Sequence, residues 1–303
     1  MQNNKSQITG ILWMILHCFL ISSIVTIAKF LGHKNYSEGQ VIFFHSFVAL
    51  IILLPFALHF EGKKLLKTNL FSLHLLRGII GTASLFIYFF ALKFIPLTDG
   101  RALALLSPVI TFIFAVIFIK ENLNIKKSLA LMLSLFGGYI IINPGNVSFH
   151  PMLFLILAAM IMWSVIDLII KKLSKTESAI KQLFFLAAFS ALFSLPFAII
   201  DWQNPENFVE ILLLILIGVI FIFNSLAIFL AIKNADLTIL TPIDFCGMIF
   251  TAILSYLVFG EIIKTNSLIG SIIVFSSSLY LIYQESKAAK ELTKISEANL
   301  QKE

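Results

Sequence analysis

The sequence predicts an all-α integral membrane protein of ten transmembrane helices, arranged as two inverted five-helix repeats. Three observations lead to this fold class. The composition is very apolar, the apolar residues fall into ten runs of similar length, and landmark residues recur at one fixed offset along the chain. Together they predict where each span lies, how the chain is oriented and how its two halves are related.

The composition favours a protein whose side chains are mostly solvated by lipid. Apolar residues make up 59% of the 303 positions and charged residues 13%, with a mean hydropathy of +0.98. A soluble domain carries about 25% charged residues, so the lipid bilayer is the expected partner. The net charge of +6 does not indicate nucleic acid, because the lysines lie in short gaps between apolar runs, as membrane topology requires.

The spans follow from the length of the apolar runs. Crossing ~30 Å of hydrocarbon takes ~20 residues at a rise of ~1.5 Å each. Runs of about this length cover residues 8–31, 39–60, 72–94, 97–119, 126–143, 150–171, 179–200, 208–232, 237–259 and 265–284. No small-residue cleavage site follows the first run, which we expect to be retained as a helix. Residues 285–303 alternate Lys and Glu and are expected to form a cytoplasmic tail, helical or disordered.

The distribution of Lys and Arg predicts that both termini are cytoplasmic. With the N-terminus inside, 17 of the 22 basic residues face the cytoplasm. The remaining five are Lys29, Lys34, Lys93, Arg101 and Lys264. This bias agrees with the positive-inside rule, and an even number of spans returns the C-terminus to the same side.

Several landmark residues recur after 140 positions. Ala91-Leu92-Lys93, Leu97-Thr98 and Glu121 reappear as Ala231-Ile232-Lys233, Leu237-Thr238 and Glu261. We therefore divide the chain into a first repeat, 8–143, and a second repeat, 150–284. Five helices in each repeat make the second inverted relative to the first, an arrangement that typically permits alternating access to a solute held near the midplane.

Chemical motifs of other protein classes do not occur in the sequence. We find no His-x-x-x-His metal pair, nucleophile elbow or Walker phosphate loop, which disfavours a membrane enzyme and predicts neither metal nor cofactor. Cys18 and Cys246 lie inside apolar runs and are expected to pack as small apolar groups. A channel remains an alternative to a carrier, and a homodimer is one arrangement that the sequence leaves open.

The landmarks also carry a family resemblance. The stretch from Leu76-Arg77-Gly78 through Ala91-Leu92-Lys93, Ser107-Pro108 and Lys120-Glu121 resembles the EamA domain of the drug/metabolite transporter superfamily. A second copy runs from Ala231 through Thr241-Pro242 to Gly260-Glu261, so the resemblance covers about residues 8–284. One departure is that Ser277-Ser278 stands where the first repeat has Gly137-Gly138, which leaves a small-residue interface.

Within this superfamily the chain is most similar to the S-adenosylmethionine uptake carriers of obligate intracellular bacteria. The Lys- and Phe-rich composition and the Leu-Arg-Gly-Ile-Ile-Gly opening of the third run carry this similarity. It implies a secondary transporter of the inner membrane that imports S-adenosylmethionine, its small-molecule substrate, in exchange for S-adenosylhomocysteine. The alternative is an exporter of amino acids, drugs or other metabolites.

Ionisable groups inside spans are costly and often functional, so they are the first candidates for substrate binding. Asp244, just after Pro242, is placed to counter a cationic solute or carry a proton, or it is a helix-start acid near the interface. Asp167 is a second candidate, although Lys171 four residues on suggests a simple salt bridge.

Other polar and aromatic residues of the spans complete the candidate set. His17, and less strongly His45, are placed to shuttle protons or bind a ligand. Arg77 is a candidate for a substrate carboxylate, or it anchors its span at the headgroups. Asn224 needs a polar partner, and Trp163 is able to stack on an adenine or a sulfonium. Gating or structural roles are assigned to residues at span ends, namely Glu121, Glu261, Asp99 and Arg101, of which Asp99 and Arg101 form either a gate or a surface pair.

Overall fold

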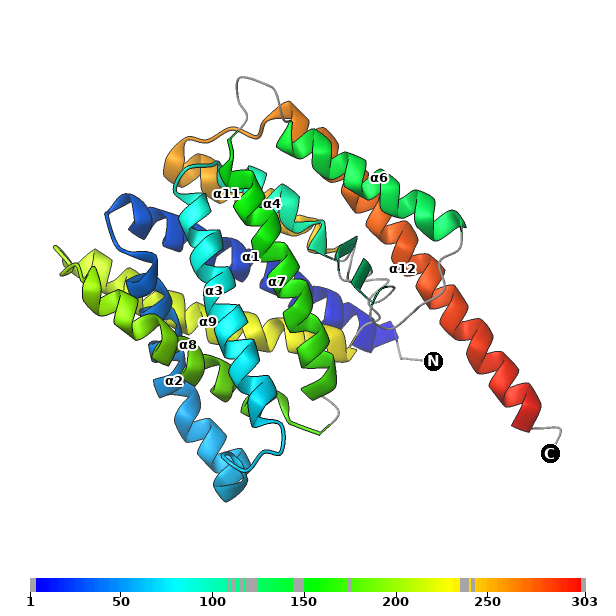
Figure 1. Ribbon diagram of the computed structural model, residues 1–303, viewed down its shortest axis with the longest axis horizontal. Coiled ribbons are helices and arrows are strands. Elements are labelled where there is room, and N and C mark those ends of the chain that lie inside the picture. Colours follow the sequence, from blue (N-terminus) through cyan, green and yellow to red (C-terminus); the bar gives the residue numbers. More distant parts are fainter. Residues whose placement is uncertain are drawn as a thin grey trace.

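The computed structural model describes residues 4–107, 109–110, 113–114, 117, 125–143, 150–173, 176–234, 240 and 243–300, and these contain helices and no strand. The first half contains α1 (Asn4–His33), α2 (Glu38–Glu61), the 3-10 turn η1 (Gly62–Lys64), α3 (Phe71–Leu92), α4 (Leu97–Ala104) and α6 (Ile125–Ile142). The second half contains α7 (Met152–Leu173), α8 (Ala179–Ile200), α9 (Phe208–Asn234), α11 (Cys246–Phe259) and α12 (Thr265–Leu300) (Figure 1).

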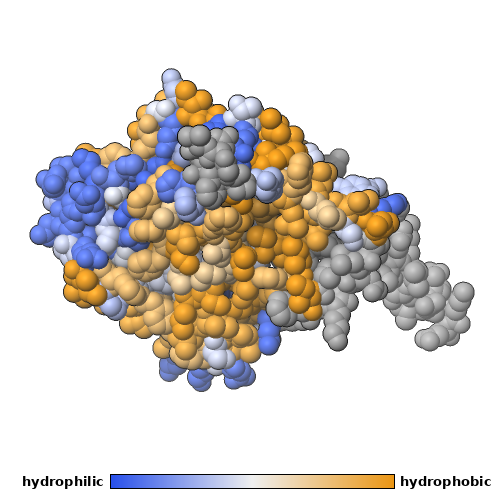
Figure 2. Space-filling model, turned by 45° about the horizontal axis from the view of Figure 1, so that its top comes forward, coloured by the Kyte–Doolittle hydropathy of each residue, from blue (hydrophilic) through white to orange (hydrophobic). Residues whose placement is uncertain are grey.

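Long apolar helices dominate the molecule. In the part of the chain that the structure describes, six of them, α1, α2, α3, α7, α8 and α9, are long and apolar enough to cross a membrane. Figure 2 shows apolar side chains covering most of one face, with hydrophilic residues gathered toward one end. Large apolar side chains such as Leu12, Phe56 and Leu257 are exposed, as expected where lipid rather than water is the solvent. The prediction of an all-α integral membrane protein is therefore confirmed.

The second helix of each half begins in the same way and contains a proline. Ser37 opens α2 by accepting a hydrogen bond from the Gln40 amide, and Ser178 opens α8 by accepting one from the Lys181 amide. Such N-caps satisfy amides that the first helical turn leaves free. A proline also lies inside each helix, Pro55 in α2 and Pro196 in α8, where packing against neighbouring helices compensates for the lost backbone bond.

Two predicted spans are broken rather than continuous. In the first half α4 ends at Ala104, and Leu105 and Leu106 form a turn. The amide-free Pro108 explains this end, because residue 108 would otherwise bond the Ala104 carbonyl. In the second half Phe245 lies in a turn and α11 begins only at Cys246. Phe245 is 140 residues after Leu105, which is the offset of the predicted repeat.

Helix contacts run mainly between the two halves. The most extensive pairs are α2 with α8, α6 with α12, α1 with α9, α3 with α7 and α2 with α9, followed by α3 with α8 and α1 with α11. When each helix is exchanged for its counterpart in the other half, α1–α9 becomes α7–α3 and α2–α9 becomes α8–α3, while α2–α8 and α6–α12 are unchanged. The set of contacts is thus the one expected of two structurally related halves.

Helices α6 and α12 lie side by side along one edge of the molecule (Figure 1). Their backbones approach closely at Gly137 and Gly270: a Cβ on Gly270 would lie 2.7 Å from the Gly137 carbonyl oxygen. The predicted small-residue contact of α6 is therefore made with Gly270 of α12, two helical turns before Ser277 on the same helix face. α12 then continues to Leu300, so the predicted tail is helical over its described length.

Candidate functional site

A cavity of about 210 Å³ lies between α1, α2, α3, α7, α8 and α9. Aromatic rings form much of its wall: the Tyr88 and Trp163 centroids are 5.0 Å apart, and the His45 and Phe221 centroids are 4.2 Å apart. Asn224 contributes a side-chain amide to the same wall. The cavity is thus apolar and aromatic with a few polar groups, which is the usual make-up of a small-molecule site.

Helical periodicity aims these residues at the cavity. On α3, Gly81, Leu85, Tyr88 and Phe89 follow one another at intervals of four, three and one residues, and so they lie on one helix face. On α1, Ile21, Ile24 and Val25 share a face in the same way. Gly81 has no side chain, which widens the cavity beside Tyr88.

The two broken helices meet at an ion pair. Arg101 Nη2 on α4 lies 2.7 Å from Asp244 Oδ1 and 3.0 Å from the Asp244 carbonyl oxygen. Arg101 precedes the turn at Leu105 by one helical turn, and Asp244 directly precedes the turn at Phe245. A Cβ on Gly247 would lie 2.3 Å from Arg101 Nη2, so the glycine makes this approach of α4 to α11 sterically feasible.

Polar groups of α1, α9 and α11 lie near this ion pair. Cys18 Sγ lies 3.7 Å from Asp244 Oδ1, and Ser22 Oγ lies 2.9 Å from Thr251 Oγ1. His17 lies one residue before Cys18 and is close to both Asn224 and Asp244. Three buried atoms here have no well-formed hydrogen bond to any residue that the structure describes. They are His17 Nδ1, Asn224 Oδ1 and Arg101 Nε.

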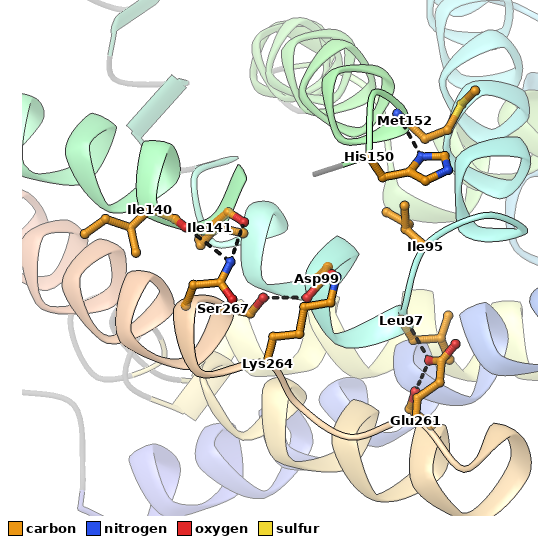
Figure 3. A network of polar contacts seen from close by, with 12 residues as sticks. Ile95, Leu97, Asp99, Ile140, Ile141, His150, Met152, Glu261, Lys264 and Ser267 are labelled. Atoms are coloured by element: carbon orange, nitrogen blue, oxygen red, sulfur yellow. Dashed lines mark hydrogen bonds and ion pairs between the residues drawn. The ribbon is translucent and has the colours of Figure 1, made fainter. Parts of the chain in front are cut away.

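A second polar cluster ties the halves together at one end of the bundle. We call Lys29, Asp99, Glu261, Lys264 and Ser267 the α11–α12 loop cluster. Lys29 Nζ lies 2.5 Å from Glu261 Oε1 and also donates to the Ile95 carbonyl. Glu261 accepts a further bond of 3.0 Å from the Leu97 amide, as Figure 3 shows. Glu261 therefore fixes the loop after α11 to the start of α4.

Asp99 forms the other centre of this cluster. Its side chain is 3% exposed and accepts hydrogen bonds from Lys264 Nζ at 2.9 Å and Ser267 Oγ at 2.5 Å (Figure 3). Asp99 and Arg101 do not form a surface pair with each other, and their gating role stays a prediction. Side chains that are two residues apart on a helix point in different directions. Asp99 and Arg101 therefore bind different partners in the second half.

A third polar cluster lies at the opposite end, where α3 and α8 begin. We call Thr68, His74, Glu177 and Lys181 the α7–α8 loop cluster. Glu177 accepts a bond of 2.5 Å from Thr68 Oγ1 and lies 3.1 Å from Lys181 Nζ. Burial opposes the charged form of Glu177, but the hydrogen bonds from Thr68 and Lys181 outweigh it and hold the pKa of this carboxyl below its ordinary value.

The predicted site residues separate into groups in the structure. Trp163 and Asn224 line the central cavity, and His17 lies between Asn224 and Asp244. Arg77 instead contacts Gln182 of α8, beside the α7–α8 loop cluster and away from the cavity lining. The side chain of Asp167 and the whole of Glu121 lie outside the described residues.

Sequence reasoning did not single out Tyr88, Phe89 and Phe221, which form most of the aromatic wall. The helical spacing of Gly81, Leu85 and Tyr88 was the available signal. It was too weak to use because the chain has 31 Phe and 6 Tyr, most of them on apolar spans, and periodicity does not distinguish a face toward a cavity from a face toward lipid.

Comparison with known proteins gives matches along nearly the whole chain. The EamA-like transporter family matches twice, over residues 8–143 and 150–283. An S-adenosylmethionine uptake transporter of Rickettsia felis is 31% identical over 94% of this chain and 96% of its own length. A protein of the same description from Rickettsia bellii is 32% identical over 94% and 97%, and a riboflavin transporter of Vibrio cholerae is 25% identical over 93% and 95%.

The fold also occurs in a solved crystal structure. That structure covers 92% of this chain and 96% of its own, with a TM-score of 0.59 and 16% sequence identity. At this level of identity the likeness concerns the fold alone.

Proposed function

The chain belongs to the EamA-like transporter family, and from this premise we propose that it imports S-adenosylmethionine across the bacterial inner membrane. The family is one of transporters, so the protein is a multi-pass inner-membrane carrier of a small molecule and not an enzyme. The observation that carries the choice of substrate is the full-length similarity, at 31–32% identity, to transporters named for S-adenosylmethionine uptake.

The chemistry of the central cavity supports this substrate. S-adenosylmethionine has an adenine ring, a sulfonium cation and an amino-acid head. Aromatic faces such as those of Tyr88 and Trp163 favour both the adenine ring and the cation. Asn224 offers an amide that can bond a heteroatom of the base. We therefore propose Trp163, Asn224, His17 and Asp244 as substrate-binding residues.

Alternating access between two inverted repeats is the mechanism we propose. The exchange-symmetric helix contacts and the equivalent breaks at Leu105 and Phe245 support it, because broken helices near the interface of two repeats commonly form transport sites. The α11–α12 loop cluster then closes one end of the path, and its ion pairs must open for the solute to enter there. With both termini cytoplasmic, as the basic residues predict, this closed end is the outer one.

Uptake of radiolabelled S-adenosylmethionine by cells that express the chain tests the proposal. Saturable uptake above that of cells with an empty vector is the expected result, and unlabelled S-adenosylhomocysteine is expected to chase the label out if exchange operates. No uptake, with the protein shown in the membrane, would overturn import and favour an exporter of amino acids, drugs or other metabolites. Cross-linking in the same membranes tests whether the carrier is a homodimer.

A further inference from the structure

We propose that Arg101 and Asp244 together form a receptor for the zwitterionic amino-acid head of the substrate. In this arrangement Arg101 binds the α-carboxylate and Asp244 binds the α-ammonium, while the adenosyl part occupies the aromatic cavity. The inference rests on the proposed function and extends it, since it assigns Arg101, which the sequence placed among gating residues, to substrate recognition.

The position of the pair fits a binding site between the halves. Arg101 belongs to the first half and Asp244 to the second, and each lies beside the break of its own helix. Helix breaks leave backbone polar groups available and bring charged side chains to the interface of the repeats. A ligand that binds both residues at once therefore bridges the two halves of the protein.

The ion pair leaves one hydrogen-bond donor of Arg101 available to a ligand. Arg101 uses Nη2 for both of its bonds to Asp244, and no residue that the structure describes bonds its buried Nε. The Asp244 side chain is 31% exposed. A guanidinium N–H makes a charge-assisted hydrogen bond to a carboxylate oxygen, and Nε–H is a donor of Arg101 that this ion pair leaves unused.

Two neighbouring atoms strengthen the case for a polar ligand. His17 Nδ1 and Asn224 Oδ1 are also buried and make no well-formed hydrogen bond with a described residue, although the two side chains lie close to one another. A buried polar atom without a good hydrogen-bond partner destabilises the folded protein, so the atoms around this ion pair favour a polar ligand that bonds them. By contrast Glu261, which is paired with Lys29 across the halves, is bonded by Lys29, Ser255 and Leu97.

The aromatic cavity lies within reach of the pair. The Tyr88 hydroxyl oxygen lies 3.6 Å from the position that a Cβ would take on Gly100, the residue before Arg101. Asn224 lines the cavity and is also close to His17. Tyr88 and Asn224 thus connect the two regions, and one elongated ligand can place its charged head at Arg101 and its base near Trp163.

The experiment compares three ligands that share the adenosine and its 5′ sulfur. Binding to the purified full-length protein is measured by thermal shift with S-adenosylmethionine, with decarboxylated S-adenosylmethionine, which lacks the carboxylate, and with 5′-methylthioadenosine, which lacks both the amino-acid head and the sulfonium charge. The wild-type protein is expected to bind S-adenosylmethionine at least about tenfold more tightly than the decarboxylated ligand, because a charge-assisted hydrogen bond to the carboxylate is lost.

Variants of Arg101 and Asp244 test which of these two residues binds the carboxylate of the amino-acid head and which binds the ammonium. Arg101→Gln is expected to weaken S-adenosylmethionine by about tenfold or more and to leave the decarboxylated ligand nearly unchanged. Asp244→Asn is expected to weaken both ammonium-bearing ligands and to spare 5′-methylthioadenosine. The exposed residues Lys126 and Asp201 supply matched controls, since Lys126→Gln and Asp201→Asn make similar charge changes and should retain the wild-type preferences.

The outcomes separate this inference from the proposed function. If no ligand affects the wild-type protein, both fail. If wild-type protein binds S-adenosylmethionine but Arg101→Gln weakens all three ligands equally, or none, only the zwitterion receptor fails. If Arg101→Gln does not fold, the double variant with Asp244→Asn removes both charges together. It is expected to bind S-adenosylmethionine and decarboxylated S-adenosylmethionine about equally, and a retained preference for the carboxylate-bearing ligand would overturn the inference.

Discussion

Lys29 Nζ of α1 lies 2.5 Å from Glu261 Oε1, so one ion pair joins the first half of the transporter to the loop that follows α11. The Lys29 side chain is 3% exposed and also binds the Ile95 carbonyl, while Glu261 binds the Leu97 amide. Three segments of the bundle end therefore depend on these two residues. This contact is the strongest candidate for the element that holds one end of the transport path closed.

Removal of Lys29 is expected to destabilise this closed form. Lys29→Ala leaves a partly buried carboxylate without its cation, which we expect to lower the free energy of unfolding by about 3 kcal/mol, measured by denaturant unfolding in detergent. The double variant Lys29→Ala with Glu261→Ala should lose less than the sum of the two single variants, because no unpaired charge remains. Additive losses would show that the two charges do not stabilise one another.

Much of the fold could be predicted from the sequence because a bilayer constrains it so strongly. Run lengths locate α1, α2, α3, α7, α8 and α9, since each must cover the hydrocarbon with apolar side chains. Hydropathy did not locate the breaks at Leu105 and Phe245, because the residues around them are as apolar as those of a continuous helix. The sequence signal for a change in the backbone there was a proline near each break, Pro108 and Pro242.

The site was harder to predict than the spans. Asp244, Trp163 and Asn224 could be chosen as polar or aromatic residues of apolar runs, but their partners could not. Arg101 and Asp244 are 143 residues apart in sequence, and which long-range pairs meet is decided by the packing of the two halves. The same holds for Asp99, whose partners Lys264 and Ser267 come from the end of the chain.

The α7–α8 loop cluster predicts a pH dependence of stability. Because the pKa of Glu177 is lower in the folded protein than its ordinary value of 4.5, the unfolded chain binds the proton first as the pH falls. The stabilisation is complete above about pH 4.5 and is lost as the pH falls through the lower folded value. Unfolding temperatures measured between pH 6 and 3 should show this loss, and Glu177→Gln should make the curve flatter. An equal slope in both proteins would contradict it.

The contact between α6 and α12 predicts the cost of adding a side chain. A Cβ on Gly270 would lie 2.5 Å from Ile141 Cγ1 and 2.7 Å from the Gly137 carbonyl oxygen, so Gly270→Ala must push the helices apart. We expect a loss of about 1–3 kcal/mol in the free energy of unfolding. Gly81→Ala is the matched control, since its Cβ would lie 3.5 Å from the nearest atom. A loss as large in the control would argue against close packing as the cause.

The aromatic wall predicts a change in substrate affinity. Trp163→Ala removes a ring that we expect to stack on adenine, and such stacking contributes about 1–3 kcal/mol per base. The Michaelis constant for S-adenosylmethionine uptake should therefore rise about tenfold or more, while the amount of protein in the membrane is unchanged. Trp163→Phe should retain most of the affinity. Equal uptake kinetics in wild type and Trp163→Ala would place the adenine elsewhere.

Counterflow in proteoliposomes tests the central claim most directly, because the purified protein is then the only carrier in the membrane. Vesicles loaded with unlabelled S-adenosylmethionine or S-adenosylhomocysteine are diluted into a trace of labelled S-adenosylmethionine. The account predicts transient accumulation of label inside vesicles that contain the protein, and a much smaller accumulation with Asp244→Asn. Label that enters no faster than into protein-free vesicles would contradict S-adenosylmethionine transport by this chain.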